Sequence, residues 1–122
     1  MALEREVIWV GSSHKDIRGL PDDVQDELGY VLHLVQNGES DSSIKPLTGK
    51  DLKGVYEIRA DDDGNTYRAV YVLNLGDRIY MLHVFQKKSK KGIATPKQDM
   101  DLIRSRLKWA QDLAKELDDE SN

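Results

Sequence analysis

Hydrophobic residues recur with two different periods along this chain. Near the N-terminus, the apolar run Val7–Val10 is closed by Gly11-Ser12-Ser13, a pattern typical of a buried strand. Residues 14–19 allow one or two helical turns, and Pro21-Asp22-Asp23 indicates a helix start, because carboxylates favour the positive end of a helix dipole. The next apolar positions follow spacings of three and four and predict a helix ending at Asn37-Gly38; they are Val24, Leu28, Val31, Leu32 and Val35.

After a polar connector and a turn-rich loop over residues 39–50, the period changes to two. Strands are predicted at Val55–Arg59, Thr66–Leu73 and Arg78–Lys87, with turns at residues 61–65 and 74–77 between them. Because the connections are short, these three strands are expected to form an antiparallel meander, with the N-terminal strand pairing beside it.

The last predicted element is a helix. It follows a basic loop, Lys87–Lys91 with Gly92, and Thr95-Pro96 marks its start. Residues 118–122 are expected to fray as an acidic tail. The apolar stripe of this predicted helix consists of Met100, Ile103, Leu107, Ala110, Ala114 and Leu117. The order of elements predicts a small α+β sandwich, with residues 1–122 forming a single domain.

Composition narrows the class of protein. The 122 residues include no cysteine, which excludes a disulfide scaffold and a thiol nucleophile. The longest apolar run, Ala69–Leu73, has five residues, so no membrane span is expected. No signal peptide is visible, which makes the cytoplasm the expected location. The net charge of −4 is unevenly distributed, because residues 45–108 hold 14 basic and 8 acidic side chains. Such a basic middle can offer a surface that attracts phosphates; the alternative is a solvated surface whose charge is simply uneven.

Common catalytic motifs are missing from the sequence. There is no Walker-type phosphate loop, no dinucleotide-binding glycine pattern and no helical pair of metal-binding histidines. The three histidines, His14, His33 and His83, fall on a loop, a helix and a strand. The acidic run at residues 61–65 lacks the later glutamate of a calcium loop and is interpreted as a turn. No metal and no cofactor are therefore expected.

The meander strands carry a set of cations. Strand alternation puts Arg68 on the face of Val70 and Val72, and Arg59 on the face of Glu57. His83, Phe85 and Lys87 share one face, with Lys88 on the other. If the strands are adjacent, these cations converge on a surface that can bind phosphate. The alternative is that Arg59 pairs with Glu57 or with an aspartate of the turn, while the lysines merely end an exposed strand.

Several segments together form a composite motif: Gly54-Val55-Tyr56-Glu57-Ile58-Arg59, Tyr67-Arg68-Ala69-Val70-Tyr71, and His83 to Lys88 followed by Thr95-Pro96. With Lys45-Pro46-Leu47-Thr48-Gly49 before them, they resemble the RelE/ParE toxin superfamily of type II toxin–antitoxin systems, in its HigB-like, phage-derived branch. The resemblance covers residues 45–110 tightly. It implies a RelE-like fold, in which N-terminal helices and a C-terminal helix pack on one face of a twisted, mainly antiparallel sheet.

The resemblance also implies a function. Ribosome-dependent members cut messenger RNA, so it predicts a metal-independent endoribonuclease whose partners are messenger RNA on the ribosome and a helix-turn-helix antitoxin. It assigns catalysis to Arg59, Arg68, Lys87 and Lys88, and RNA binding to His83, Phe85, Lys90 and Lys91. This chain departs from the family pattern in three ways. The spacer before Thr95-Pro96, residues 89–94, is longer; Ile103 stands where a small alanine is common; and the last helix offers no tyrosine as a late catalytic group. The alternatives are a gyrase inhibitor, against which the clustered cations argue, and a phage-encoded interaction module.

Overall fold

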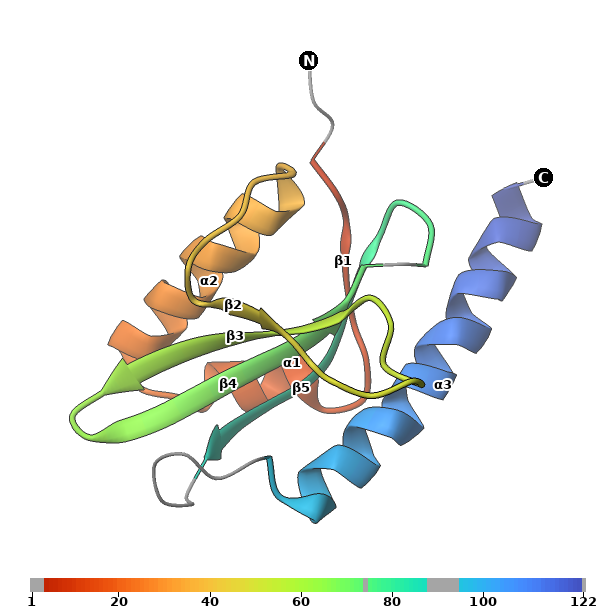
Figure 1. Cartoon of the computed structure of the whole chain (residues 1–122). Coiled ribbons are helices and arrows are strands. Elements are labelled where there is room, and N and C mark those ends of the chain that lie inside the picture. Colours follow the sequence, from red (N-terminus) through yellow and green to blue (C-terminus); the bar gives the residue numbers. More distant parts are fainter. Residues whose placement is uncertain (1–3, 74, 88–94, 122) are drawn as a thin grey trace.

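The computed structural model describes residues 4–73, 75–87 and 95–121. Within these ranges, one mixed sheet has the strand order β1-β5-β4-β3-β2, and helices lie on both sides of it (Figure 1). The elements, in chain order, are β1 (Val7–Trp9), α1 (Ser13–Arg18), α2 (Asp22–Gln36), β2 (Ile44–Pro46), β3 (Val55–Asp62), β4 (Asn65–Val72), β5 (Ile79–Lys87) and α3 (Lys97–Ser121). The predicted α+β class is confirmed.

The predicted antiparallel meander is formed by β3, β4 and β5. Its first hairpin is tighter than predicted, because pairing continues as far as Asp62 opposite Asn65. Only Asp63 and Gly64 remain in the loop, with φ of 49° and 79°, as a two-residue hairpin turn requires. The sequence pattern had indicated that Arg59 ends its strand, which was wrong. Arg59 lies inside β3, which continues to Asp62.

Both edges of the sheet are short strands. β1 pairs in parallel with β5, Val7 opposite Ile79, which confirms that the N-terminal strand joins the sheet. At the other edge, β2 pairs antiparallel with β3, Ile44 opposite Ile58. These residues were predicted to form a connector and a loop, which was wrong. A three-residue strand has too few positions to show alternation, and it ends on Pro46, which an edge strand tolerates.

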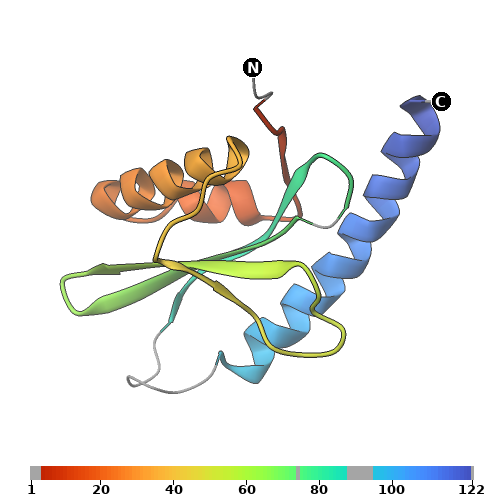
Figure 2. The same cartoon turned by 45° about the horizontal axis from the view of Figure 1, so that its top comes forward.

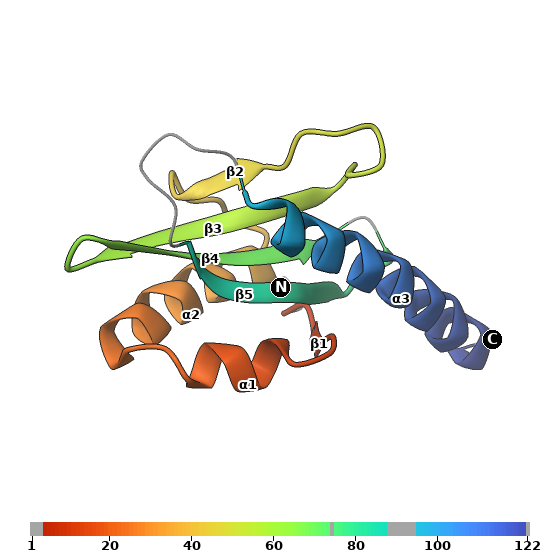
Figure 3. The ribbon, with the colours of Figure 1, turned by 90° about the horizontal axis from the view of Figure 1, so that it is seen from below.

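Helices cover the two faces of the sheet. Seen from below, α1 and α2 lie against one face and α3 crosses the other (Figure 3), and the same separation is visible when the view of Figure 1 is tilted by 45° (Figure 2). The expectation that all helices pack on one face was therefore wrong for α3. The reason lies in β4, which is apolar on both sides: Tyr67, Ala69 and Tyr71 belong to the core under α2, whereas Val70 and Val72 belong to the core under α3. An apolar sheet face must be covered.

A bulge in β5 changes which residues face α3. Val70 pairs with His83 but Tyr71 pairs with Met81, so Leu82 is an extra residue. Leu82 packs in the core under α3, and His83 also contacts α3. The Leu82 carbonyl accepts a hydrogen bond from Nη1 of Arg106 at 2.9 Å, which anchors α3 to the bulge.

The last helix is longer than predicted. α3 begins after Thr95-Pro96, as expected, but continues to Ser121, so the prediction of a frayed tail was wrong for residues 118–121. Asp118 lies 3.8 Å from Nη1 of Arg78, the residue before β5, and this ion pair favours the helical end. None of the helices in the described ranges is long and apolar enough to cross a membrane.

Candidate active site

Three cations and one carboxylate meet on the α3 side of the sheet. Glu57 and Arg59 lie on the same face of β3, and the register sets Arg59 directly opposite Arg68 of β4. Lys87, at the end of β5, is opposite Thr66, two residues before Arg68. Successive residues of a strand alternate between faces, so these positions share one side. We call Arg59, Arg68 and Lys87, together with Glu57, the cation cluster.

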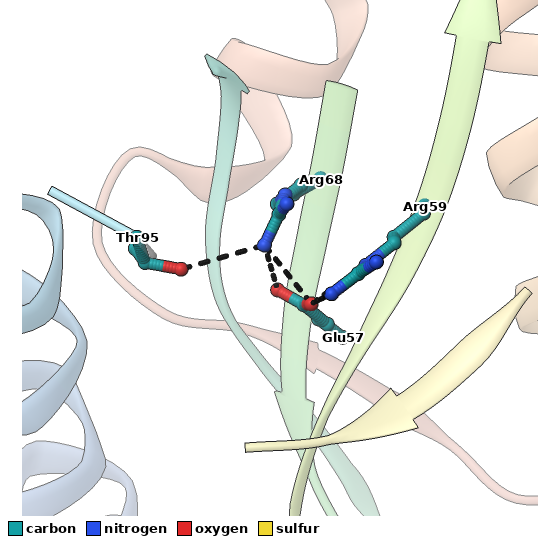
Figure 4. A network of polar contacts seen from close by, with 4 residues as sticks. All are labelled: Glu57, Arg59, Arg68 and Thr95. Carbon is teal, nitrogen blue, oxygen red and sulfur yellow. Dashed lines mark hydrogen bonds and ion pairs between the residues drawn. The ribbon is translucent and has the colours of Figure 1, made fainter. Parts of the chain in front are cut away.

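Glu57 is the centre of the contacts within the cluster (Figure 4). Its Oε1 accepts hydrogen bonds from Nε of Arg59 at 2.9 Å and from Nη1 of Arg68 at 3.0 Å. The same Nη1 lies 3.0 Å from Oε2 and 3.5 Å from the hydroxyl of Thr95, just before α3. Hydrogen bonds between charged groups are the strong ones in proteins, so the two guanidinium groups are held in place.

Most of the cluster is buried. Glu57 is 2% exposed, Arg68 7% and Lys87 8%, whereas the side chain of Arg59 is 46% exposed. Burial lowers the pKa of Lys87, and the positive charges of Arg68 and Arg59 lower it further, while Glu57 acts in the opposite direction. A lysine with a lowered pKa can exchange a proton near neutral pH more readily than an exposed one.

These positions support one part of each interpretation of the cations. Arg59 does pair with Glu57, as the alternative held. Lys87, however, does not merely end an exposed strand, because it is buried beside two arginines. The strand spacing thus identified cations that do converge, and it missed that a buried carboxylate holds two of them.

His83 and Phe85 lie next to the cluster and under α3. Their rings are stacked with centroids 4.6 Å apart, and both residues are buried. His83 Nε2 lies 2.8 Å from Oδ1 of Asp99, in the first turn of α3. Their assigned RNA-binding role stays a prediction, as do the catalytic roles of the cluster.

Other assignments fall on parts of the chain that the structure does not describe. Lys88, Lys90 and Lys91 lie outside the described residues. In the described ranges, no group of three or more histidines, aspartates or glutamates is arranged to hold a metal ion.

Two side chains that hold the site together escaped the sequence analysis. The strand pattern indicated Glu57 as a partner of Arg59 but not of Arg68, and no pattern assigned a role to Asp99. A signal for Glu57 was present, because the carboxylate lies between Val55 and Arg59 at alternate positions of one strand and so shares their face. For Asp99 no comparable signal exists, since its contact depends on how α3 crosses the sheet.

Comparison with known proteins agrees with this fold. A chain of the crystallised toxin–antitoxin complex RelBE2 from Mycobacterium tuberculosis superposes with a TM-score of 0.50 at 19% identity, over 69% of this chain and 99% of that chain. The fold is therefore RelE-like, as the sequence resemblance implied. The family model "Phage derived protein Gp49-like (DUF891)" matches residues 15–108, so this chain belongs to the Gp49-like family of phage-derived proteins. No curated protein matches it.

Proposed function

We propose that this protein is the toxin of a type II toxin–antitoxin system and that it cuts messenger RNA on the ribosome, in the cytoplasm and without a cofactor. The observation that carries the proposal is the burial of Lys87 beside Arg68 and Arg59, with its pKa lowered. The RelE-like fold supports it, because the structure with that fold comes from a toxin–antitoxin complex.

The proposed reaction is attack of an RNA 2′-hydroxyl on the adjacent phosphorus. The P–O5′ bond breaks, leaving a 2′,3′-cyclic phosphate and a 5′-hydroxyl. The transition state carries additional negative charge on the phosphoryl oxygens, which Arg68 and Arg59 are suited to stabilise. Lys87 in its neutral form accepts the 2′-hydroxyl proton, and water delivers the proton that the leaving oxygen needs. The ribosome would orient the RNA, which explains how few groups the site requires.

Cleavage of ribosome-bound transcripts, mapped by primer extension, tests this proposal. Wild-type protein is expected to produce discrete cuts, and Lys87→Met to reduce their rate by about 10²–10⁴-fold, the usual value of a general acid or base. The matched control is Lys15→Met, which removes an exposed lysine from α1 on the opposite face of the sheet and should cut normally.

A supercoiling assay run beside the cleavage assay separates this function from its alternative. Transcripts left intact by a folded, toxic protein that inhibits gyrase would contradict the nuclease and support the gyrase inhibitor. The cation cluster favours the nuclease, because an inhibitor that acts by protein binding does not need buried cations around one carboxylate.

The proposed partner is a helix-turn-helix antitoxin that covers the cation cluster or displaces α3 from it. Its gene is expected beside the gene for this protein. Co-purification followed by native mass spectrometry should recover a complex of the two. Failure of the neighbouring gene products to bind at micromolar concentration would contradict this part of the proposal.

A further inference from the structure

A buried carboxylate is unexpected in a site proposed to bind phosphate. Glu57 repels an anion, yet it lies between the two arginines of the cation cluster and is 2% exposed (Figure 4). A buried ion pair is weak evidence of stability, because removing the charges from water offsets much of their attraction. The position of Glu57 therefore calls for an explanation other than stability.

The backbone dictates this position. Glu57 precedes Arg59 by two residues on β3, so both side chains leave the same face. On β4, Glu57 is opposite Val70, and Arg68 is two residues away from Val70, diagonal to Glu57. Long side chains on diagonal positions reach each other. The register thus sets one carboxylate within reach of both guanidinium groups.

The contacts orient both arginines. Arg59 approaches Oε1 with Nε and Nη2, each at 2.9 Å. Arg68 bonds both oxygens through Nη1, at 3.0 Å each. A guanidinium held through two nitrogens, or by two acceptors, has few orientations left. The side chain of Arg59 remains 46% exposed, which leaves part of it accessible to a ligand.

We propose that Glu57 is a positioning residue: its carboxylate holds Arg59 and Arg68 in one arrangement and offsets part of their charge beside Lys87, without itself touching RNA. The inference rests on the proposed nuclease function. Without Glu57, three cations would face one another in a poorly solvated site, and the arginines would separate. The direction in which Glu57 acts on the pKa of Lys87 agrees with this role, because it opposes the two arginines.

The test compares Glu57→Gln with Asp51→Asn. Glu57→Gln keeps the shape of the side chain and removes its charge. Asp51→Asn removes an aspartate that pairs with Arg104 at 2.8 Å on the surface, which makes it a matched loss of one ion pair. Two quantities are measured on each: the titration of the Lys87 side chain by NMR with labelled lysine, and single-turnover cleavage of ribosome-bound messenger RNA against pH.

In Glu57→Gln, the titration of Lys87 should move to lower pH than in the wild type, and the lysine-dependent limb of the pH–rate profile should move with it. Cleavage should fall about 10–100-fold, the usual effect of a small misplacement of catalytic groups. Asp51→Asn should change neither quantity. A folded Glu57→Gln in which either the titration or the cleavage rate stays as in the wild type overturns the inference.

Glu57→Asp provides the second variant, because it keeps the charge while shortening the side chain. Lys87 should then titrate nearly as in the wild type, while cleavage falls because the arginines have moved. If Glu57→Gln does not fold, wild-type cleavage by Glu57→Asp overturns the inference. Wild-type protein that cuts no transcript contradicts the nuclease instead, and the Lys87 titration still decides whether Glu57 controls the cluster.

Discussion

His83 on β5 and Asp99 on α3 are joined by a 2.8 Å contact between Nε2 and Oδ1. The side chain of His83 is 8% exposed and that of Asp99 27%, so the contact lies at the edge of the core. Seven residues later, Arg106 bonds the carbonyl of Leu82 in the bulge of β5. These two contacts fix α3 on the part of the sheet that carries the cation cluster.

Asp99→Ala should lower the free energy of unfolding by about 1–3 kcal/mol, because a buried imidazole nitrogen loses its partner. Urea denaturation measures this. Asp101→Ala is the control, since Asp101 pairs with Lys97 across one exposed turn of the same helix. Its cost should stay below about 0.5 kcal/mol. Equal losses in the two variants would show that the His83–Asp99 contact contributes no more than an exposed ion pair.

Arg68→Ala should abolish growth arrest and messenger-RNA cleavage. Losing one preorganised charge contact to a transition state typically costs about 3–4 kcal/mol, or about 10²–10³ in rate. Arg68→Ala should also lower the melting temperature, because Glu57 is buried and would keep Arg59 as its one arginine partner in the cation cluster. Arg68→Lys keeps the charge and should recover more of the stability than of the activity. Undiminished cleavage by Arg68→Ala would remove this residue from the site.

Lys87→Met should make the protein more stable at neutral pH while inactivating it. Burial lowers the pKa of Lys87 in the folded state below 10.5, so the unfolded chain binds this proton more tightly. The lysine therefore destabilises the fold when protonated, and stability recovers as pH rises from the lowered pKa toward 10.5. Melting temperatures from pH 7 to 10.5 should show the advantage of Lys87→Met shrinking with pH. A constant difference would contradict the lowered pKa.

Gly11→Ala should destabilise the protein more than Gly64→Ala. Both glycines have positive φ, 59° and 79°, which costs roughly 1–3 kcal/mol for another residue. At Gly11, an added Cβ would also lie 2.7 Å from Nε of Arg106, whereas at Gly64 nothing lies within 4 Å. Because Arg106 bonds both Leu82 and Ser12, it cannot move without losing a contact. Chemical denaturation of the two variants measures the difference.

Periodicity in the sequence was enough to predict the meander, the helix at Asp22–Gln36 and the last helix. These elements depend on local alternation, which their own residues display. The cation cluster was predictable in part. Arg59, Arg68 and Lys87 each lie on a different strand, the three strands were expected to be adjacent, and alternation along each strand assigns each side chain to a face.

The remaining features depend on contacts between distant segments. Alternation cannot reveal the extra residue Leu82, because the bulge exists only relative to the register with β4. The contact between Glu57 and Arg68 requires the same register. β2 is a strand because β3 offers it a pairing edge, and its own three residues show no pattern.

The parallel pairing of β1 with β5 also has a consequence for the order of folding. Val7 and Ile79 are neighbours in the sheet although most of the chain separates them, and parallel pairing of distant segments is slow to form. The meander, by contrast, contains mainly local contacts and can form first. During synthesis, Val7–Trp9 must therefore wait for the last strand to emerge, and the cation cluster assembles only late in translation, when β5 joins the sheet. A partner that binds the nascent chain would meet the N-terminal helices before it meets a complete site.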